Sequence, residues 1–363
     1  MLRSNAKFKI CLIVSTMMIV MSGCSRKNKL PEIKTPNFKD VIIGEKLGEK
    51  TQFYSINNGK LNDKQSVDKL DKIQDLKYNS DKKTYIFIQN NFKGKELTNN
   101  KIEILKNDKK IELDDFYYAE DIKLSKDGSK LAYRSFAKDN LNSAEGLKVF
   151  DIKSKKLFKI KSKVIVSGNL YSWLNENEIL YYGIIPGKRK SAKVYKYNFN
   201  TNKEEEYIDN IKGYCTDFIL IGKDLLYISS IGNESSLNYY DKEKDSIKII
   251  SKDIDNIHES IVDKNKNVYL IANNKLERKT YLYSFLKKDM SLNKLTYDFP
   301  TKIDTKGGIG KDSSGNIYFL GNNESNKDSL KNDVYMYNRK NNSVQIVSEE
   351  KSLYNIFQNK EME

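Results

Sequence analysis

An internal repeat of 43 to 49 residues constrains the fold of this chain more than any other feature of its sequence. The clearest copies are DKNKNVYLIANN, residues 263–274, and DSSGNIYFLGNN, residues 312–323, in which a polar turn precedes an apolar core. Weaker copies fill the chain from residue 73 onward. The third core residue of each copy marks the period: Phe87, Tyr133, Tyr181, Tyr227, Leu270 and Phe319. A period of this size is typical of propeller blades and of helical arrays.

The composition of each copy favours strands over helices. The cores are short, rich in Tyr, Ile, Leu, Phe and Val, and bounded by Gly, Asn, Asp and Ser, which favour turns. A second hairpin follows each core, as in LKVFDIKSKKLFKI at residues 147–160, and another strand precedes the polar turn. Four antiparallel strands per copy make one propeller blade. We therefore predict an all-β fold, a single β-propeller of four-stranded blades.

The two ends of the repeat region are incomplete copies that complement each other. Residues 51–62 look like the third and fourth strands of a blade, residues 40–45 like a second strand and residues 352–357 like a first strand. Together they would form one composite blade and close the ring without an exposed sheet edge. Six internal blades and this composite blade predict seven in all. A six-bladed ring with the terminal strands as additions is the alternative.

The N-terminus has the layout of an export signal. Arg3, Lys7 and Lys9 precede an apolar run at residues 10–21, which is shorter than the roughly 20 residues that a membrane-spanning helix needs. An uncleaved anchor helix is the alternative. The predicted organisation is a signal peptide at residues 1–23, a flexible lipidated tether at 24–39, the propeller at 40–358 and a tail at 359–363.

The end of the apolar run resembles the lipobox of bacterial lipoproteins. Met21, Ser22, Gly23 and Cys24 supply a hydrophobic residue, two small residues and the cysteine, with Met in place of the usual Leu. The resemblance implies cleavage between Gly23 and Cys24, an S-linked diacylglycerol on Cys24 and acylation of its new N-terminus, for example by palmitate. Two acyl chains anchor a protein firmly. We therefore expect a membrane-anchored, extracytoplasmic protein, and the abundance of Lys, Asn, Ile and Tyr favours a Gram-positive cell surface.

The repeats resemble those of TolB-like and WD40-like bacterial propellers. DIKLSKDGSKLAYRS, residues 121–135, and YSWLNENEILYYG, residues 171–183, carry the likeness, although Trp173 is the only tryptophan. The resemblance spans most of residues 40–358 and implies a blade fold, not a chemistry. The same repeat occurs in the propeller domains of prolyl oligopeptidase-type peptidases, but this sequence contains no G-x-S-x-G motif of their hydrolase domain.

Few residues of catalytic type are present. His258 is the only histidine, so a Ser-His-Asp triad or a histidine-based zinc or iron site cannot be built from this chain alone. The cysteines are Cys11, Cys24 and Cys215, which leaves no disulfide pair within the propeller. We interpret Cys215 as a small buried residue on a strand and His258 as a loop or core residue. No catalytic residue, cofactor site or metal site is predicted.

Two polar stretches could be mistaken for sites. Asp263, Asn265 and Asn267 alternate like the oxygen ligands of a calcium loop, but the glycine and the distal glutamate of such a loop are missing. A plain turn is the prediction, because Asp and Asn tolerate the backbone angles of turns. The acidic trio at residues 204–206 falls on a predicted outer strand, where we expect it to face solvent.

The net charge of +15 raises the question of an anionic partner. Two lysine-rich stretches, residues 153–163 and 187–196, fall on an outer strand and in a loop, where lysines face solvent and prevent pairing of sheet edges. Attraction to anionic lipid or wall polymer is the alternative interpretation. Nucleic acid is not expected as a partner, because an exported protein does not meet the genome and no nucleic-acid-binding module is recognisable.

The function expected from these features is a lipid-anchored, non-catalytic module of the cell envelope that binds or scaffolds an unidentified protein or glycan. The alternative is a carboxylate-based carbohydrate-active enzyme. That alternative requires acidic side chains from different blades to converge in the central funnel of the ring.

Overall fold

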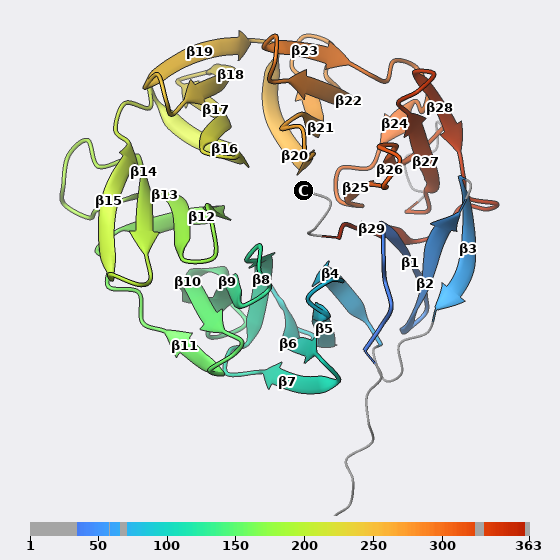
Figure 1. Cartoon of the computed structure of the whole chain (residues 1–363), viewed down its shortest axis with the longest axis horizontal. Coiled ribbons are helices and arrows are strands. Elements are labelled where there is room, and N and C mark those ends of the chain that lie inside the picture. Colours follow the sequence, from blue (N-terminus) through green and yellow to red (C-terminus); the bar gives the residue numbers. More distant parts are fainter. Residues whose placement is uncertain (1–34, 58, 66–70, 324–329, 360–363) are drawn as a thin grey trace, which may run out of the picture. The chain divides into compact units, whose positions relative to one another are not determined.

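The computed structural model describes residues 35–57, 59–65, 71–323 and 330–359. Over these ranges the strands form seven sheets, which stand around a common axis as the blades of a propeller (Figure 1). The prediction of an all-β propeller with seven blades is confirmed, and the six-bladed alternative is wrong. The only helix in these ranges is the short 3-10 turn η1 (Leu141–Ser143), so none of their helices could cross a membrane.

Five blades each consist of four consecutive antiparallel strands that follow one another from the ring centre outward. Blade 1 contains β4 (Ile73–Asn79), β5 (Thr84–Lys93), β6 (Thr98–Lys106) and β7 (Lys109–Leu113). Blade 2 contains β8 (Tyr118–Leu124), β9 (Lys130–Phe136), β10 (Ala144–Asp151) and β11 (Lys156–Phe158). Blade 3 contains β12 (Ile165–Trp173), β13 (Glu178–Ile184), β14 (Lys193–Asn198) and β15 (Lys203–Ile208). Blade 4 contains β16 (Tyr214–Ile221), β17 (Asp224–Ile231), β18 (Glu234–Asp241) and β19 (Ser246–Ser251). Blade 5 contains β20 (Ile254–Val262), β21 (Val268–Asn274), β22 (Lys279–Leu286) and β23 (Ser291–Lys294).

Blade 6 differs because its inner strand is divided. β24 (Lys302–Ile303) and β25 (Ile309–Lys311) both pair with β26 (Ile317–Asn322), which is followed by β27 (Asp333–Asn338) and β28 (Ser343–Ile346). The last blade joins the two ends of the repeat region.

The composite blade has the strand order expected from the sequence. Its innermost strand is the C-terminal β29 (Tyr354–Phe357), followed outward by β1 (Ile42–Leu47), β2 (Lys50–Asn57) and β3 (Lys60–Gln65). β29 therefore supplies the first strand and the N-terminal segment supplies the other three. The prediction of a composite terminal blade is confirmed.

The repeated apolar core is the second strand of each internal blade. All six residues of β26 are buried, as are the first six of β5 and of β17. A strand that is buried on both faces cannot alternate apolar with polar residues, which explains the continuous runs such as TYIFI and IYFL. The outermost strands are mostly exposed and rich in charge. Each blade therefore runs from a buried second strand to a solvated edge.

The hydrophobic core lies between neighbouring blades. Separate clusters of buried side chains join blades 1 and 2, 2 and 3, 3 and 4, 4 and 5, 5 and 6, and blade 6 with the composite blade. Each blade thus packs both faces against its neighbours, and the ring closes only when the composite blade is complete.

Aromatic rings fill the seam between the composite blade and blade 1. Phe38 is fully buried, and its ring centroid lies 5.1 Å from that of Phe53 and 5.7 Å from that of Tyr78. Asn359 is also fully buried, and its Nδ2 donates to the backbone oxygen of Lys39 at 3.0 Å. Buried contacts of the ring therefore extend into the ranges that the sequence indicated as tether and tail.

Candidate functional site

The inner strands of the six internal blades are interrupted at a matching level of the ring. In β4, β8, β12, β16 and β20 the pairing register with the second strand shifts, and in blade 6 the inner strand breaks between β24 and β25. Such bulges re-aim side chains and are over-represented next to functional sites. This level of the ring is the candidate site.

Blades 1, 2, 4 and 5 each place an acidic residue within a strand at the interrupted level, and Asp304 of blade 6 lies in the break between β24 and β25. We call the acids of the first four blades the inner carboxylates: Asp75, Asp121, Asp217 and Glu259. In three of them the strand residue opposite the acid comes directly after the third core residue, which marks the repeat. These pairs are Asp75 with Ile88, Asp217 with Ile228 and Glu259 with Ile271. Asp121 lies within the bulge of β8. The inner carboxylates therefore occupy equivalent positions in blades 1, 2, 4 and 5.

Two lysines accompany the inner carboxylates, and their charges act on carboxylates of blades that are not their neighbours. Lys77 Nζ lies 3.4 Å from Oδ1 of Asp75, and its charge also interacts with Glu259 of blade 5. Lys123 of blade 2 interacts with Asp217 of blade 4. Blades 1 and 5 are not neighbours, and neither are blades 2 and 4. These side chains can therefore interact only across the centre of the ring.

Blade 2 holds its inner carboxylate in a strained conformation. Asp121 has φ of 57°, in the left-handed region, which costs a residue with a side chain about 1–2 kcal/mol. Arg134 fixes this arrangement, because its Nε donates to Oδ2 of Asp121 at 3.1 Å and its Nη2 pairs with Glu120. Lys123 Nζ donates to the backbone oxygen of Tyr171 in blade 3 at 2.6 Å. The strained turn is thus tied both within its blade and to the next one.

Burial shifts the pKa values of three groups at the ring centre toward neutrality. Burial raises the pKa of Asp217 to about 6, although the backbone N–H of Ile257, 3.5 Å away, favours the charged form. Burial also raises the pKa of Glu259 to about 7, against the opposing charge of Lys77. Burial lowers the pKa of Lys123 to about 8. The protonation state of this centre therefore changes near physiological pH.

Two kinds of chemistry suit such a centre. Acids and bases whose pKa values lie near 7 serve as proton donors and acceptors in enzymes, and they also occur in buried ion networks that hold a fold together. In the part of the chain that the structure describes, no group of three His, Cys, Asp or Glu side chains is placed to hold a metal ion. The centre can bind a charged group, exchange protons with it, or link the blades.

The two faces of the ring differ in polarity. We call the face on which inner strands begin and second strands end the apolar face, and the opposite one the polar face. Sixteen large hydrophobic side chains are exposed in the described ranges. Twelve of them lie on the apolar face: Leu47, Phe92, Leu141, Ile165, Ile184, Tyr214, Ile231, Leu276, Tyr297, Phe299, Leu330 and Leu353. The other four lie on outermost strands: Leu157, Ile247, Ile249 and Ile346.

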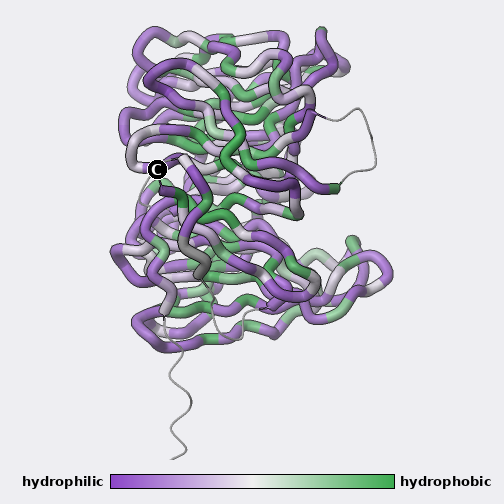
Figure 2. The backbone as a smooth tube through the Cα atoms, turned by 90° about the vertical axis from the view of Figure 1, so that its right-hand side faces the viewer, coloured by the Kyte–Doolittle hydropathy of each residue, from purple (hydrophilic) through white to green (hydrophobic). Residues whose placement is uncertain are grey.

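The polar face carries hydrophilic turns. In Figure 2 the ring is seen from the side, and the turns at its left-hand edge are mostly hydrophilic. The chain also enters the ring on this face, because Thr35 donates its backbone N–H to Oδ1 of Asp108 at 3.0 Å, and Asp108 lies in the turn between β6 and β7. The apolar face is thus the one opposite the point of entry.

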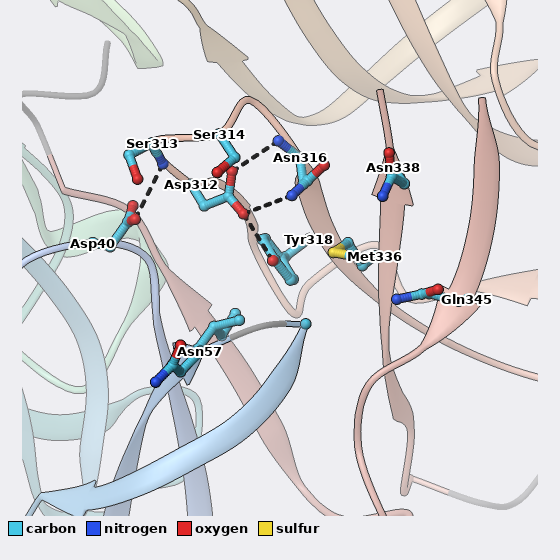
Figure 3. A pocket seen from close by; sticks show the side chains of 12 residues that line it. Asp40, Asn57, Asp312, Ser313, Ser314, Asn316, Tyr318, Met336, Asn338 and Gln345 are labelled. Atoms are coloured by element: carbon cyan, nitrogen blue, oxygen red, sulfur yellow. Dashed lines mark hydrogen bonds between the residues drawn. The ribbon is translucent and has the colours of Figure 1, made fainter. Parts of the chain in front are cut away.

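A cavity of about 410 Å³ opens on the polar face between blade 6 and the composite blade (Figure 3). Oδ2 of Asp312 accepts hydrogen bonds from Asn316 Nδ2 and from the hydroxyl of Tyr318, each at 2.9 Å. Oδ2 of Asp40 accepts the backbone N–H of Ser313 at 3.1 Å. Three carboxamides complete the polar lining: Asn57, Asn338 and Gln345. Because both carboxylates are used by the protein itself, they stabilise the seam rather than offer free ligands.

The residues singled out from the sequence have structural roles. Cys215 is buried in β16, and burial raises the pKa of its thiol well above the ordinary value, so the thiol is unreactive. His258 lies in β20, where its Nε2 forms a hydrogen bond of 2.9 Å with Oδ1 of Asn273. Oδ1 of Asp263 accepts the backbone N–H of Asn265 at 2.8 Å, which confirms the turn. These residues do not form a common site.

The outer acidic and basic stretches pair with each other. Lys193 Nζ lies 2.6 Å from Oε2 of Glu206, and Lys196 Nζ lies 2.8 Å from Oε1 of Glu205, so β15 neutralises these two lysines. Both lie on β14, so the prediction of a loop for residues 187–196 is wrong for residues 193–196, which pair in register with β13 and β15 and therefore form a strand. Glu205 and Glu206 face solvent as predicted. Glu204 does not: it is half-buried and accepts a hydrogen bond from the hydroxyl of Tyr181. The 153–163 stretch includes the exposed turn before β11.

The lipidation prediction lies outside the described residues. Cys24, the cleavage position Gly23 and Cys11 all belong to residues 1–34, for which the structure describes nothing. The prediction of a lipid anchor therefore stays a prediction.

Sequence reasoning missed the inner carboxylates, although a signal was present. Asp75 and Lys77 in one copy match Asp121 and Lys123 in the next, two residues apart in both. Glu259 lies four residues before the turn that Asp263 opens, at the equivalent position. Alignment of the inner strands would have shown an acid at this position in four copies. The repeat is more visible in the second strands, because burial on both faces makes their apolar pattern stronger.

Comparisons with known proteins bear on the fold. No family model matches the chain, and no curated protein matches it. Among solved structures, the chain is similar to a puromycin hydrolase, with a TM-score of 0.52 and 8% identity over 75% of this chain and 47% of that one. It is also similar to the acylaminoacyl peptidase of Pyrococcus horikoshii, with a TM-score of 0.51 and 13% identity over 85% of this chain and 50% of that one. TolB from Acinetobacter baumannii gives a TM-score of 0.49 and 10% identity over 88% of this chain and 82% of that one.

The likeness to the two hydrolases shows the β-propeller fold alone. The chain spans about half the length of the two hydrolases. At identities of 8% and 13%, their activities carry no weight for this chain. The features that bear on function are the ring centre and the two faces.

Proposed function

We propose that this chain is a lipid-anchored, extracytoplasmic β-propeller that binds a partner protein through its apolar face and does not catalyse a reaction. The observation that carries the proposal is the placement of the exposed hydrophobic side chains. Twelve of sixteen lie on one face of the ring, and in the described ranges none lies in the turns of the opposite face. A protein that exposed these side chains at random would not divide them in this way.

The exposed side chains are of the kind that drives protein association. Tyr214 is 71% exposed and Ile231 59%, and the two lie at one end of adjacent strands in blade 4. Ile165 and Ile184 form the corresponding pair in blade 3. Full burial of one such side chain contributes about 1.5–3 kcal/mol, so a partner that covers two blades gains several kcal/mol. Aromatic and aliphatic anchors of this type dominate the binding energy of protein interfaces.

The point of chain entry is consistent with the proposed anchor. Thr35 contacts the turn at Asp108 on the polar face, and only ten residues, 25–34, lie between it and Cys24. A lipid on Cys24 would thus be attached through the polar face by a short tether. The apolar face would stay free for a partner from the extracytoplasmic space.

A second candidate function is favoured by one observation. Asp217 and Glu259 lie at equivalent positions of neighbouring blades and have pKa values of about 6 and about 7. A carboxylate-based carbohydrate-active enzyme needs such a pair, because one acid must be protonated while the other is ionised. This candidate predicts that the purified chain cleaves an envelope polysaccharide and that Glu259→Gln abolishes the cleavage. Absence of any cleavage by the wild-type chain would remove it.

The anchor is tested by the variant Cys24→Ala, expressed in place of the wild-type chain. We expect it to retain its signal peptide and to lose the mass of the lipid, and labelled palmitate to enter only the wild-type protein. Palmitate incorporation equal to that of the wild type would contradict the anchor.

Binding through the apolar face is tested by photo-crosslinking in intact cells. A crosslinking amino acid at Leu276, which is 73% exposed on the apolar face, is expected to give a protein adduct. The same amino acid at Lys126, exposed on the polar face, serves as the control and is expected to give none. An adduct from Lys126 alone, or from neither position, would contradict the proposal.

A further inference from the structure

Blade 3 carries a loop on the apolar face that is longer than its hairpin needs. The loop joins β13 to β14 and has eight residues, 185–192, whereas the equivalent connection between β17 and β18 in blade 4 has two. It contains Lys188, Arg189 and Lys190, all exposed, and no acidic residue. Two residues suffice to connect antiparallel strands, and longer surface loops are where binding residues are commonly found.

Ser191 holds this loop in one conformation. Ser191 is buried, and its hydroxyl accepts the backbone N–H of Ile185 at 2.9 Å and donates to the backbone oxygen of Lys188 at 2.8 Å. The hydroxyl of Tyr195 in β14 donates to the backbone oxygen of Ser191 at 2.7 Å. A loop closed in this way presents its cations at fixed positions, so less conformational entropy is lost when a partner binds.

A row of lysines leads to the same end of blade 3. Residues 159–165 contain no acid, and Lys161, Lys163 and Ile165 are exposed while the residues between them are not. This alternation is typical of an extended segment, in which side chains two residues apart point to the same side and lie about 6–7 Å apart. Lys163 therefore lies beside Ile165 on the surface.

Two isoleucines add an apolar contact to these cations. Ile165 and Ile184 lie opposite each other in the pairing of β12 with β13, and they are 58% and 47% exposed. Ile184 directly precedes the loop. We call the whole surface the basic corner: Lys163, Ile165, Ile184, Lys188, Arg189 and Lys190.

The four cations of the basic corner are not neutralised by the protein. Within the described residues, their side chains form no hydrogen bond and no ion pair. The three glutamates of β15 are already used by lysines of β14 and by the hydroxyl of Tyr181. Because like charges repel, a loop that holds them close together favours the binding of an anionic group.

We propose that the basic corner binds an acidic segment of the partner protein, with an apolar side chain of that segment covering Ile165 and Ile184. This inference rests on the proposed protein-binding function of the apolar face, and it adds the charge of the partner and the blade that recognises it. Arg189 can bind one carboxylate through two parallel N–H···O bonds. Burial of the isoleucines supplies affinity, while the charges steer the encounter and select an acidic partner.

An anionic membrane or a polymer of phosphate groups fits the basic corner less well. The chain enters the ring on the polar face, so a chain anchored there would turn its basic corner away from its own membrane. A phosphate polymer would leave the two isoleucines uncovered. An acidic protein segment with an apolar side chain matches both parts of the surface.

Binding of peptides to the purified full chain tests the charge and the apolar contact separately. The probes are a fluorescently labelled peptide of Glu, Ser and two Leu, the same peptide with Gln for Glu, and the same peptide with Ser for Leu. Fluorescence anisotropy should show the first binding about tenfold more tightly than either of the others. Added salt should weaken it, because the pairs lie at the surface. Equal affinity of the three peptides would overturn the proposal.

A pair of matched variants assigns the binding to the basic corner. One variant is Lys188→Glu, Arg189→Glu, Lys190→Glu, and the control is Lys153→Glu, Lys155→Glu, Lys156→Glu, which alters exposed lysines at the polar end of blade 2 and changes the net charge equally. Each set includes one residue with positive φ, at positions 190 and 155. The affinity for the acidic peptide should fall about tenfold or more in the first variant and less than twofold in the second.

Melting temperatures close to that of the wild type should show that both variants fold, because every altered side chain is exposed. An equal loss of affinity in the two variants would overturn the proposal and assign binding to the general charge of the surface. Binding of the chain to phosphatidylglycerol vesicles without any binding of the acidic peptide would also overturn it, in favour of a membrane.

Crosslinking at Leu276 in intact cells separates this inference from the proposed function. We expect the protein adduct to decrease about tenfold in the variant of the basic corner and to remain in the control variant. An adduct that persists in both would show that the apolar face binds a protein without the basic corner, so this inference alone would be wrong. Absence of an adduct in the wild type would contradict the proposed function as well.

Discussion

Gly44 in β1 leaves the space that the ring of Phe357 in β29 occupies: a methyl group on Gly44 would lie 2.7 Å from Cε2 of Phe357. These residues are more than 300 positions apart in the chain and meet in the composite blade, where Gly44 pairs with Asn355. The closure of the ring therefore depends on the absence of a side chain at this position.

The variant Gly44→Ala should destabilise the propeller by about 1–3 kcal/mol, because the added methyl group displaces Phe357 from a packed site. Thermal denaturation of the purified chain measures the effect. The double variant Gly44→Ala, Phe357→Leu should recover part of the loss, since the smaller side chain gives way. A melting temperature of Gly44→Ala equal to that of the wild type would show that the closure is looser than the structure indicates.

The stability of the ring should fall as the pH rises from about 4.5 to 7, the interval between the ordinary pKa of a glutamate and that of Glu259. In this window the folded chain holds a proton on Glu259 that the unfolded chain has released, so folding is favoured on the acid side. The expected loss is about 1–2 kcal/mol after allowance for solvent screening. Asp217, with a pKa of about 6, adds a loss of the same sign below pH 6.

The variant Glu259→Gln isolates this effect. Urea denaturation at several pH values should give it a smaller decrease in the free energy of unfolding between pH 5 and 7.5 than the wild type shows. Identical pH profiles of the two proteins would mean that Glu259 titrates normally and does not lie in a buried centre.

Asp121 should tolerate asparagine better than alanine. Its φ of 57° suits the short polar side chains of Asp and Asn, and its carboxylate binds Arg134. We expect Asp121→Asn to cost about 1 kcal/mol through the weaker bond to Arg134, and Asp121→Ala to cost about 2–3 kcal/mol through the loss of the bond and the strain. Chemical denaturation measures both. Equal stability of the two variants would contradict the strained-turn description.

The fold could be predicted largely from the sequence because burial on both faces makes the second strands continuous apolar runs. The composite blade could be predicted for a related reason: residues 51–62 and 352–357 each lack the strands that the other supplies. The role of Phe38 could not be predicted, since one aromatic residue in a polar stretch carries no period.

The site was harder to predict than the fold. The inner carboxylates are visible in the sequence as single acids, but only the closed ring brings Lys77 of blade 1 toward Glu259 of blade 5. The division of the exposed hydrophobic side chains between the two faces could not be read from the sequence, because it depends on which turns lie at the same edge of the sheets. Lys46 of the composite blade and Lys93 of blade 1 likewise line one cavity only because the closed ring places these two blades side by side.

The central claim, that the apolar face binds a partner protein, is tested most directly by the amount of protein chemically crosslinked to the full chain in intact cells. The triple variant Ile184→Ser, Tyr214→Ser, Ile231→Ser changes the apolar face of blades 3 and 4. The matched control changes exposed hydrophobic side chains of outermost strands: Leu157→Ser, Ile247→Ser and Ile249→Ser. We predict that the crosslinked complex is lost in the first variant and kept in the second. A complex that persists in the first variant, or is lost equally in both, would contradict the claim.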